Sequence, residues 1–382
     1  MRIVDTTENL FELYEVLCKQ KIPTKQYKSY INSFLELKAR KRAIPLTGSF
    51  ELTPLCNLDC KMCYVHLDIN QFDQQKLLPV QAWESIIQEA YEAGMRRASI
   101  TGGECLTYAG FDDIYLYLYK LGIVPTILTN GILVDQKRLS FFKQYPPRAI
   151  QITLYGSSDD SYEAVTGHRV FNTVFKNMKN IRDAGIPLHI TITPSLYMSG
   201  DIHQILEKAH SIGVPYFINS CLKPPRENTG RIAKDITTEQ YIELYLYYNK
   251  LNNRTTVPVD FDSLPEQNHI GVNRKGLRCG AGRSAFAVMH DGNMCPCFSL
   301  RSITSKPLEI GFIAAWDKIN SFAANYHTPE ECNTCVYYHS CLSCAAIHEN
   351  APSVGHCDPR ICERTKRFVA AGIIPYPTND EE

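Results

Sequence analysis

Residues 79–131 read PVQAWESIIQEAYEAGMRRASITGGECLTYAGFDDIYLYLYKLGIVPTILTNG, and they alternate between two kinds of hydrophobic pattern. In 79–94 and 111–122 apolar residues recur at three- and four-residue steps, which predicts two amphipathic helices that each end at a glycine. The runs RASIT (97–101) and VPTILT (124–129) are short and rich in β-branched residues, as buried strands are. This order of helix and strand is the one that crossover connections between parallel strands produce.

The same alternation continues on both sides of this stretch. A strand is expected before it at 49–54, and further strands are expected after it at 149–155, 187–194 and 215–220, with helices between them. Six strands separated by helices favour an α/β fold built as a partial (β/α)6 TIM-like barrel over a complete eight-stranded barrel. In such barrels the chemistry lies at the carboxyl ends of the strands, so motifs that follow strands are the candidates for a functional site.

Three regions are predicted along the chain. Residues 1–47 form an N-terminal helical extension, residues 48–265 form the barrel, and residues 266–382 form a second domain with a tail. The last boundary is placed where the strand and helix runs shorten and where most of the fifteen cysteines begin, from Cys279 onward.

The charge and hydropathy of the chain exclude several classes of partner. Lys and Arg together number 40, as do Asp and Glu, so no overall field attracts nucleic acid or an anionic membrane. The N-terminus lacks a signal-peptide core, and no run of about 18 apolar residues occurs. We therefore expect a cytoplasmic protein that binds neither nucleic acid nor membrane. In that reducing compartment clustered cysteines favour metal or redox chemistry over disulfides.

A cysteine loop follows the first expected strand. CNLDCKMCY, residues 56–64, places Cys56, Cys60 and Cys63 with three and two intervening residues. A cubane iron–sulfur cluster normally takes four thiolates, so three would leave one iron open to a ligand that is not protein. Zinc is the alternative, but zinc sites usually combine Cys-x2-Cys with a second pair or with histidines, and here His66 is the one histidine nearby.

This loop resembles the cysteine loop of radical S-adenosylmethionine enzymes. In that family the open iron of a [4Fe–4S] cluster binds S-adenosyl-L-methionine, and one electron cleaves this cofactor to methionine and a 5′-deoxyadenosyl radical. TGGE, residues 101–104, resembles the family's Gly-Gly-Glu segment, which meets the methionine amino group. By this resemblance Gly102 and Gly103 would let the backbone approach the cofactor, and Glu104 would offset its ammonium group.

Four further residues resemble cofactor contacts of the family. Asn130 in LTNG, Thr153 in ITLYG and Thr193 in ITIT each follow or end a strand, and a hydroxyl at the position of Thr153 often reaches the ribose. Arg169 in TGHRVF matches an arginine that pairs with the cofactor carboxylate in related enzymes. Each could instead be structural, because Asn-Gly is a common turn and an arginine at a helix start commonly lies on the surface.

The second half resembles the auxiliary-cluster module called SPASM, which implies two more [4Fe–4S] clusters. The resemblance assigns the ligands in two interleaved sets, with Cys279, Cys297 and Cys344 for the first cluster and Cys332, Cys335, Cys341 and Cys362 for the second. The spacing from Cys341 to Cys344 is one residue shorter than in most of the family. Cys295 or Cys357 could be a fourth ligand of the first cluster, or that cluster keeps an open iron. A structural zinc module is the alternative for this half.

The resemblance predicts an enzyme that modifies a peptide. In this family SPASM domains accompany radical chemistry on peptides or proteins, so we expect thioether or carbon–carbon cross-linking, or epimerisation, of a ribosomally made precursor. An external one-electron reductant such as flavodoxin or ferredoxin is implied. About 47 residues precede the barrel, fewer than the leader-binding domain of many relatives, so a separate leader-binding protein could take part.

Two alternative functions remain open at this point. Enzymes that mature sulfatases by forming formylglycine resemble this chain, but their aspartate after the Gly-x4-Cys cysteine is here Phe298. A non-catalytic iron–sulfur protein would not need the three-cysteine loop beside TGGE.

Two remaining cysteines are candidates for catalysis. Cys221 follows the sixth expected strand and Cys105 follows TGGE, and either could donate a hydrogen atom to a substrate radical, as a cysteine does in the epimerases of this family. The alternative interpretation of each is a buried, small apolar residue.

Overall fold

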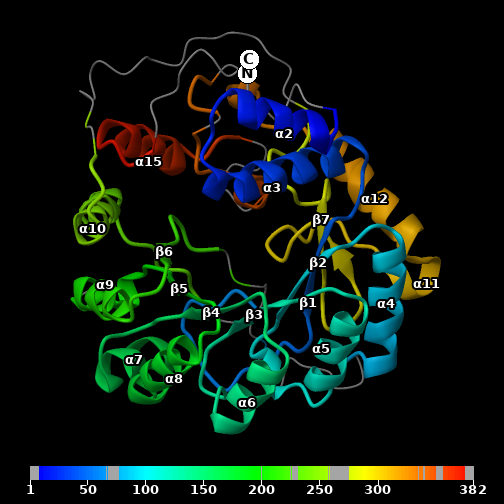
Figure 1. Ribbon diagram of the computed structural model, residues 1–382. Coiled ribbons are helices and arrows are strands. Elements are labelled where there is room, and N and C mark those ends of the chain that lie inside the picture. The colour runs from blue at the N-terminus through cyan, green and yellow to red at the C-terminus, as the bar shows by residue number, and fades with distance from the viewer. Residues whose placement is uncertain are drawn as a thin grey trace.

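One mixed sheet organises the protein (Figure 1). The computed structural model describes residues 8–65, 67, 77–198, 200–223, 225, 231–256, 258, 275–333, 335–338, 340–349 and 356–374. Within these ranges the strands are β1 (Thr47–Glu51), β2 (Arg97–Thr101), β3 (Thr126–Thr129), β4 (Ala149–Thr153), β5 (Leu188–Ile192), β6 (Tyr216–Ile218), β7 (Ala285–Val288) and β8 (Met294–Cys295). Their order across the sheet is β6-β5-β4-β3-β2-β1-β7-β8.

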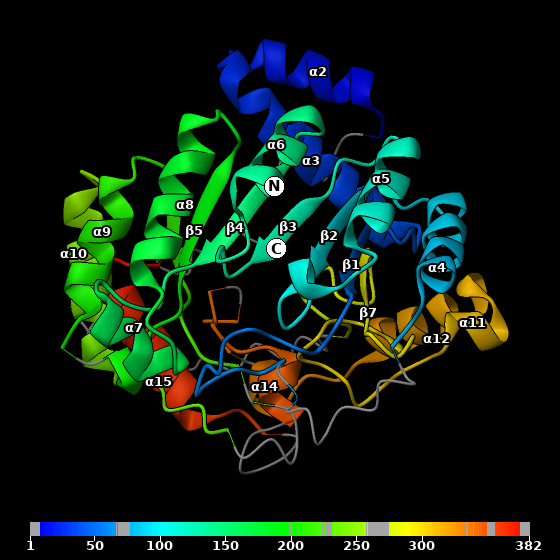
Figure 2. The same cartoon turned by 90° about the horizontal axis from the view of Figure 1, so that it is seen from below.

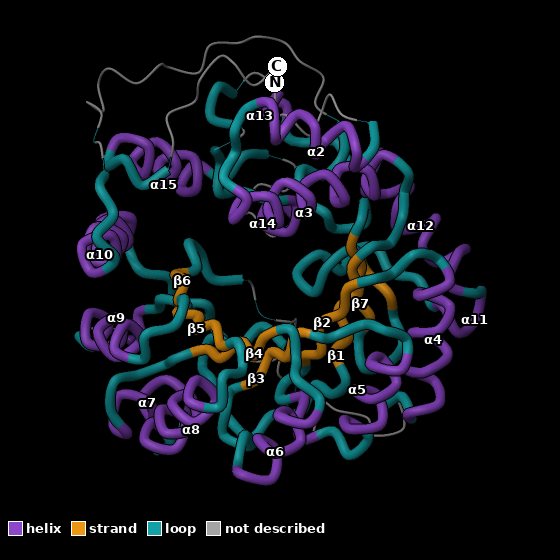
Figure 3. Tube along the Cα trace, in the orientation of Figure 1, coloured by secondary structure: helices purple, strands orange, loops and turns teal. Residues whose placement is uncertain are grey.

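The six strands expected from the sequence are confirmed, and neighbouring strands from β1 to β6 pair in parallel. Helices connect them along the outer side of the arc of strands, which Figure 3 shows by secondary structure. These helices are α4 (Val80–Glu92), α5 (Phe111–Lys120), α6 (Gln136–Gln144), α7 (Asp159–Thr166), α8 (Phe171–Asp183) and α9 (Ile202–Ser211). The predicted partial (β/α)6 barrel is therefore present.

Helix α7 was not expected from the sequence. A capping box between Ser158 and Ser161 starts it, Asp159 and Asp160 favour its first turn, and Gly167 ends it with a φ of 74°. Its importance is positional, because the carboxyl end of α7 supports the cysteine loop described below.

The N-terminal helices lie at the amino ends of the central strands. They are α2 (Leu10–Lys19) and α3 (Thr24–Lys41), as the helical extension predicted. From α3, Asn32 accepts a hydrogen bond from Arg97 at the start of β2 at 2.9 Å, and Glu36 pairs with the same arginine at 3.6 Å. The carboxyl ends of the strands are left to the cysteine loop.

The sheet continues past the boundary predicted at residue 265. Strand β7 pairs in parallel with β1, and β8 pairs antiparallel with β7. Phe286 of β7 packs edge-to-face on Phe50 of β1, with ring centroids 6.0 Å apart, and on Phe312 at 5.1 Å, and all three rings are buried. The second half of the chain thus shares the core of the first at this edge, while the domain boundaries stay a prediction.

The remaining helices belong mainly to the second half. They are α10 (Thr238–Leu251), α11 (Pro307–Ile310), α12 (Phe312–Asn325), α13 (Glu330–Asn333), α14 (Ala345–Glu349) and α15 (Pro359–Ala370). Helices α12 and α15 have 14 and 12 residues, so the expected shortening after residue 265 is only partly correct. Among the residues that the structure describes, no helix is both long and apolar enough to cross a membrane.

The two faces of the parallel strands differ in chemistry because successive side chains alternate. Isoleucine side chains of β2 to β5 are fully buried in the core, and Figure 2 shows helices around the outside of the strands. On the alternate positions, the hydroxyl groups of Ser49 and Ser99 lie 2.8 Å apart, and Gln151 donates to Thr191 at 2.8 Å. The inner surface of the barrel is therefore lined in part by uncharged polar groups.

Candidate functional site

The cysteine loop begins where β1 ends and runs across the carboxyl ends of the neighbouring strands. The Gly103 amide, just after β2, donates to the Thr53 carbonyl oxygen at 2.7 Å. Farther along, the Asp59 amide donates to the carbonyl oxygen of Thr166, the last residue of α7, at 2.9 Å. The loop is thus fastened on one side to the Gly-Gly-Glu segment and on the other to α7.

The three thiols of this loop lie in a poorly hydrated place. Cys60 is buried and Cys56 and Cys63 are half-buried. Burial raises the pKa of Cys56 to about 12, with Glu104 and Cys63 contributing, and burial together with the other two cysteines raises the pKa of Cys60 well above its ordinary value. Such thiols keep their protons unless a positively charged partner replaces them, and iron is a partner of this kind. The donor set therefore fits a metal cluster.

Zinc is the alternative metal for the cysteine loop. Within the described ranges no three His, Cys, Asp or Glu residues converge as ligands of one metal ion. His66, the histidine considered for that alternative, lies outside the described residues.

Two residues that the sequence did not single out contact the loop. Tyr155 lies close to Cys60, where its side chain opposes the rise in the pKa of that thiol. The Arg231 guanidinium donates to the Cys60 carbonyl oxygen at 2.6 Å and pairs with Asp59. Tyr155 directly follows the end of β4, so its place at the carboxyl end of a strand was an available signal. Arg231 lies in an irregular segment with no motif, and only the three-dimensional structure brings it to the loop.

Glu104 joins the ends of two strands. It is 1% exposed, and its carboxylate accepts hydrogen bonds from the Thr129 hydroxyl at 2.8 Å, the backbone amide of Asn130 at 2.7 Å and the backbone amide of Leu106 at 3.1 Å. Burial raises the pKa of Glu104, and these hydrogen bonds oppose the increase. The carboxylate is held in one orientation at the carboxyl ends of β2 and β3.

The two glycines before Glu104 are required by the cysteine loop itself. A Cβ atom on Gly102 would lie 2.5 Å from the Thr53 carbonyl oxygen, and one on Gly103 would lie 2.3 Å from the Leu55 carbonyl oxygen. The sequence led us to expect close approach of a cofactor. The structure adds that the two backbone segments are already in close contact without one.

We expect the substitution Gly103→Ala to displace the cysteine loop, because its methyl group would overlap backbone atoms, which cannot rotate away. A displacement of about 1 Å costs about 100-fold in rate where geometry is critical. We therefore expect a loss of this order in 5′-deoxyadenosine formation, measured by chromatography. Gly122→Ala is the matched control: nothing lies within 4 Å of that Cβ position, although its φ of +74° costs about 1–2 kcal/mol of stability. Equal losses in the two variants would contradict the expectation.

Asn130 reaches the cysteine loop directly. Its side-chain amide donates to the Asn57 side-chain oxygen at 2.7 Å and lies 3.7 Å from the Cys56 sulfur. Asn57, inside the loop, was not among the residues selected from the sequence. The ends of β1, β2 and β3 thus meet in one place through Cys56, Glu104 and Asn130.

The other three candidates for cofactor contacts have different surroundings. Thr153 is half-buried at the end of β4, and the Thr193 hydroxyl accepts a hydrogen bond from Asn219 at 2.8 Å. The side chain of Arg169 is 55% exposed and pairs with carboxylates of α7, among them Glu163 at 3.0 Å. A role for these three in cofactor binding stays a prediction, and for Arg169 a rearrangement of its ion pairs would be needed.

The two candidate hydrogen donors also differ from each other. Cys105 is fully buried, and its thiol donates to the Leu128 carbonyl oxygen at 3.3 Å, which is consistent with a packed core residue. Cys221 is half-buried after β6, and the Lys223 ammonium lies 3.9 Å from its sulfur.

A cavity of about 510 Å³ in the second half is walled by cysteines. The cysteines that line it are Cys279, Cys332, Cys335, Cys341, Cys344, Cys357 and Cys362. The backbone around it is drawn together by Arg278, whose guanidinium donates to the carbonyl oxygens of Tyr338, Cys341 and Ser343. A space of this size surrounded by seven thiols fits metal clusters better than a packed core.

The cysteines of this half form two groups. In one group Cys357 lies close to Cys332 and Cys362, and the nearby Cys357 thiol lowers the pKa of Cys332. Electrostatic interactions connect Cys332 with Cys335 and Cys341 as well. This group includes the set that the resemblance assigns to the second auxiliary cluster.

The other group is Cys297 with Cys279 and Cys344. Burial raises the pKa of Cys297, and these two cysteines add to the increase. Cys295 has other contacts than this group. It is fully buried, its thiol donates to the Cys297 carbonyl oxygen at 3.3 Å, and it packs against Met289.

Part of the chain matches a model of a known protein family. Residues 50–209 match the model described as Radical SAM superfamily. Among curated proteins, the chain is 22% identical over 258 residues to the antilisterial bacteriocin subtilosin biosynthesis protein AlbA of Bacillus subtilis (strain 168), a match covering 66% of this chain and 55% of AlbA. The chain thus spans little more than half the length of that relative.

Two solved structures share the fold. The crystal structure of Streptococcus suis SuiB bound to precursor peptide SuiA has a TM-score of 0.65 at 18% identity, and the likeness covers 88% of this chain and 81% of SuiB. Native anSMEcpe with bound AdoMet has a TM-score of 0.66 at 16% identity, over 86% of this chain and 97% of that one.

Proposed function

Residues 50–209 form a radical SAM domain, and from that premise we propose that this protein uses S-adenosyl-L-methionine to modify a peptide by radical chemistry. The observation that carries the proposal is the single site in which the Cys56–Cys63 loop, the Gly102–Glu104 segment and Asn130 are joined by hydrogen bonds.

The cysteine loop supplies the ligands of the proposed cofactor site. A [4Fe–4S] cluster on Cys56, Cys60 and Cys63, with S-adenosyl-L-methionine at its open iron, would supply the 5′-deoxyadenosyl radical that abstracts hydrogen from the peptide. Tyr155 and Arg231 would steady the loop, because Tyr155 lies close to Cys60 and Arg231 holds its carbonyl oxygen.

The strand ends would orient the organic cofactor. Glu104 presents a carboxylate whose position is set by three donors, and an ammonium group beside it would both gain a charge-assisted hydrogen bond and favour the ionised carboxylate. Asn130 offers a side-chain amide next to Cys56, and Thr153 offers a hydroxyl at the end of β4. The inner surface of the barrel, with its hydroxyl and amide groups, would accommodate an uncharged part of the peptide.

Two observations favour a peptide substrate: the names of related proteins and the cysteine-rich second half of the chain. AlbA is named for bacteriocin biosynthesis, and SuiB was solved with a precursor peptide. Two auxiliary clusters would be held by two sets of cysteines, and six of these cysteines line the large cavity. The first set is Cys279, Cys297 and Cys344, and the second is Cys332, Cys335, Cys341 and Cys362. An external reductant such as flavodoxin or ferredoxin, and a separate leader-binding protein, complete the proposal.

Formylglycine formation is less well supported by the site. Phe298, which stands where the sulfatase-maturing enzymes have their aspartate, packs against Ala287, Met289 and Cys295. A phenyl ring in an apolar contact cannot accept the proton that this oxidation releases.

The proposal is tested by mass spectrometry of a peptide whose gene neighbours the gene of this protein. After anaerobic incubation with the reduced holoenzyme and S-adenosyl-L-methionine, we expect each cross-link to remove two hydrogen atoms from the peptide. Epimerisation would instead leave the mass of the peptide unchanged in ordinary water and add one deuterium in heavy water. A protein that holds zinc and no sulfide after reconstitution would contradict the proposal altogether.

A further inference from the structure

The first auxiliary set is one thiolate short. A [4Fe–4S] cluster with full protein ligation takes four cysteines, whereas Cys279, Cys297 and Cys344 are three. The two cysteines that the sequence offered as a fourth are both engaged elsewhere. Cys295 donates to a backbone carbonyl oxygen and packs in a separate apolar group, and Cys357 lies with the second set.

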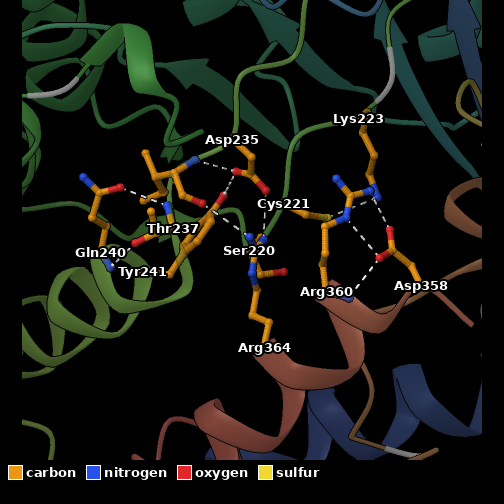
Figure 4. A network of polar contacts seen from close by, with 11 residues as sticks. Ser220, Cys221, Lys223, Asp235, Thr237, Gln240, Tyr241, Asp358, Arg360 and Arg364 are labelled. Carbon is orange, nitrogen blue, oxygen red and sulfur yellow. Dashed lines mark hydrogen bonds and ion pairs between the residues drawn. The ribbon is translucent and has the colours of Figure 1, made fainter. Parts of the chain in front are cut away.

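A different cysteine approaches this set from the barrel. Cys221 follows β6, and Arg364 of α15 holds the preceding residue by donating to the Ser220 carbonyl oxygen at 3.1 Å. Figure 4 shows these residues beside α15, with the Arg364 ion pair to Asp235, which measures 2.9 Å. The segment that carries Cys221 is therefore fixed against the second half of the chain.

A cavity connects Cys221 with the start of α14, which directly follows Cys344. Cys221 and Ile347 line the same cavity of about 360 Å³. Ile347 belongs to the first turn of α14, and its amide donates to the Cys344 carbonyl oxygen at 2.9 Å.

The charge of Lys223 points to an anionic group at the same place. Its ammonium is 3.9 Å from the Cys221 sulfur and is partly withdrawn from water. A partly buried ammonium needs a negative partner, and a cluster with four thiolates is one.

We propose that Cys221 is the fourth thiolate ligand of the first auxiliary cluster, with Cys279, Cys297 and Cys344, and that Lys223 lies beside this cluster as a compensating cation. Binding would exchange the thiol proton of Cys221, released to water, for a bond from sulfur to iron, and no electron would be transferred. The cluster would then link the last strand of the barrel to the second half of the chain, and Cys221 would not be available as a hydrogen donor. The inference rests on the proposed function only in requiring that auxiliary clusters are present.

The test uses the full chain carrying Cys56→Ala, Cys60→Ala and Cys63→Ala, so that any cluster with an open iron at the barrel site is removed. We expect this parent protein to hold about eight irons after anaerobic reconstitution. Adding Cys221→Ala to this parent should lower the iron content to about seven per chain on mild oxidation, because an iron without a protein ligand is lost first. The variant should then give the electron paramagnetic resonance signal of a three-iron cluster. Cys221→Ser should restore part of the missing iron through its oxygen.

Matched variants test which of Cys221, Cys295 and Cys357 is the fourth ligand of the first auxiliary cluster. Cys295→Ala and Cys357→Ala in the same parent should keep about eight irons and show no three-iron signal, if four thiolates remain on each cluster. Gel filtration and circular dichroism confirm that each variant is folded. A Cys221→Ala protein that keeps all its iron without the new signal overturns this inference and leaves the proposed function standing. A parent that binds neither iron nor sulfide overturns the auxiliary clusters themselves, and with them the proposed function of this half.

Discussion

Replacing Cys56, Cys60 and Cys63 together by alanine should remove about four of about twelve irons per chain and reduce 5′-deoxyadenosine formation to background. The reason is that these three thiols are the donors of one loop, and the loop is joined by hydrogen bonds to the strand ends that would hold the cofactor. Iron and sulfide analysis gives the first quantity. Chromatography of anaerobic reactions with dithionite, in the presence and absence of peptide, gives the second.

The control for this prediction is Cys18→Ala, which removes an exposed thiol of α2. It should leave the iron content and the cleavage of S-adenosyl-L-methionine as they are in the wild-type protein. If the triple variant formed as much 5′-deoxyadenosine as the Cys18→Ala protein, the assignment of the open iron to this loop would be wrong.

Changing Cys332 or Cys335 to alanine should separate the two steps of the reaction. Both residues line the large cavity of the second half, far along the chain from the cysteine loop of the barrel. We therefore expect such a variant to cleave S-adenosyl-L-methionine and to form no finished peptide product. The cleavage is measured by chromatography and the product by mass spectrometry.

Loss of folding would imitate this result and must be excluded. A cluster bound by cysteines between Cys332 and Cys362 contributes to the stability of the segment that it joins, so its removal can unfold that segment. Each variant should be monodisperse and should still cleave the cofactor before its product is examined. A folded variant that converts the peptide at the wild-type rate would leave the second cluster with a structural role alone.

The amino-acid sequence by itself determined the class of fold and suggested the groups of candidate ligands. Strand and helix periodicities are local, so β1 to β6 and their order could be predicted from runs such as RASIT at 97–101. The spacing of Cys56, Cys60 and Cys63 is also local, and so is the position of Gly-Gly-Glu after the second strand. The two cysteine groups of the second half were also proposed from a linear pattern, and their assignment to two clusters stays a prediction.

Only the tertiary structure decided which distant residues share a site. Tyr155 and Arg231 contact Cys60 because the ends of β4 and the segment after β6 converge on the same edge of the barrel. Strand β7 joins β1 because the core around Phe286 needs the rings of Phe50 and Phe312, a requirement that no short stretch of sequence expresses. The cavity that Cys221 shares with Ile347 and Arg364 forms for the same reason. Ile347 and Arg364 are far from Cys221 in the sequence, and the distance between such residues depends on the path of the whole chain.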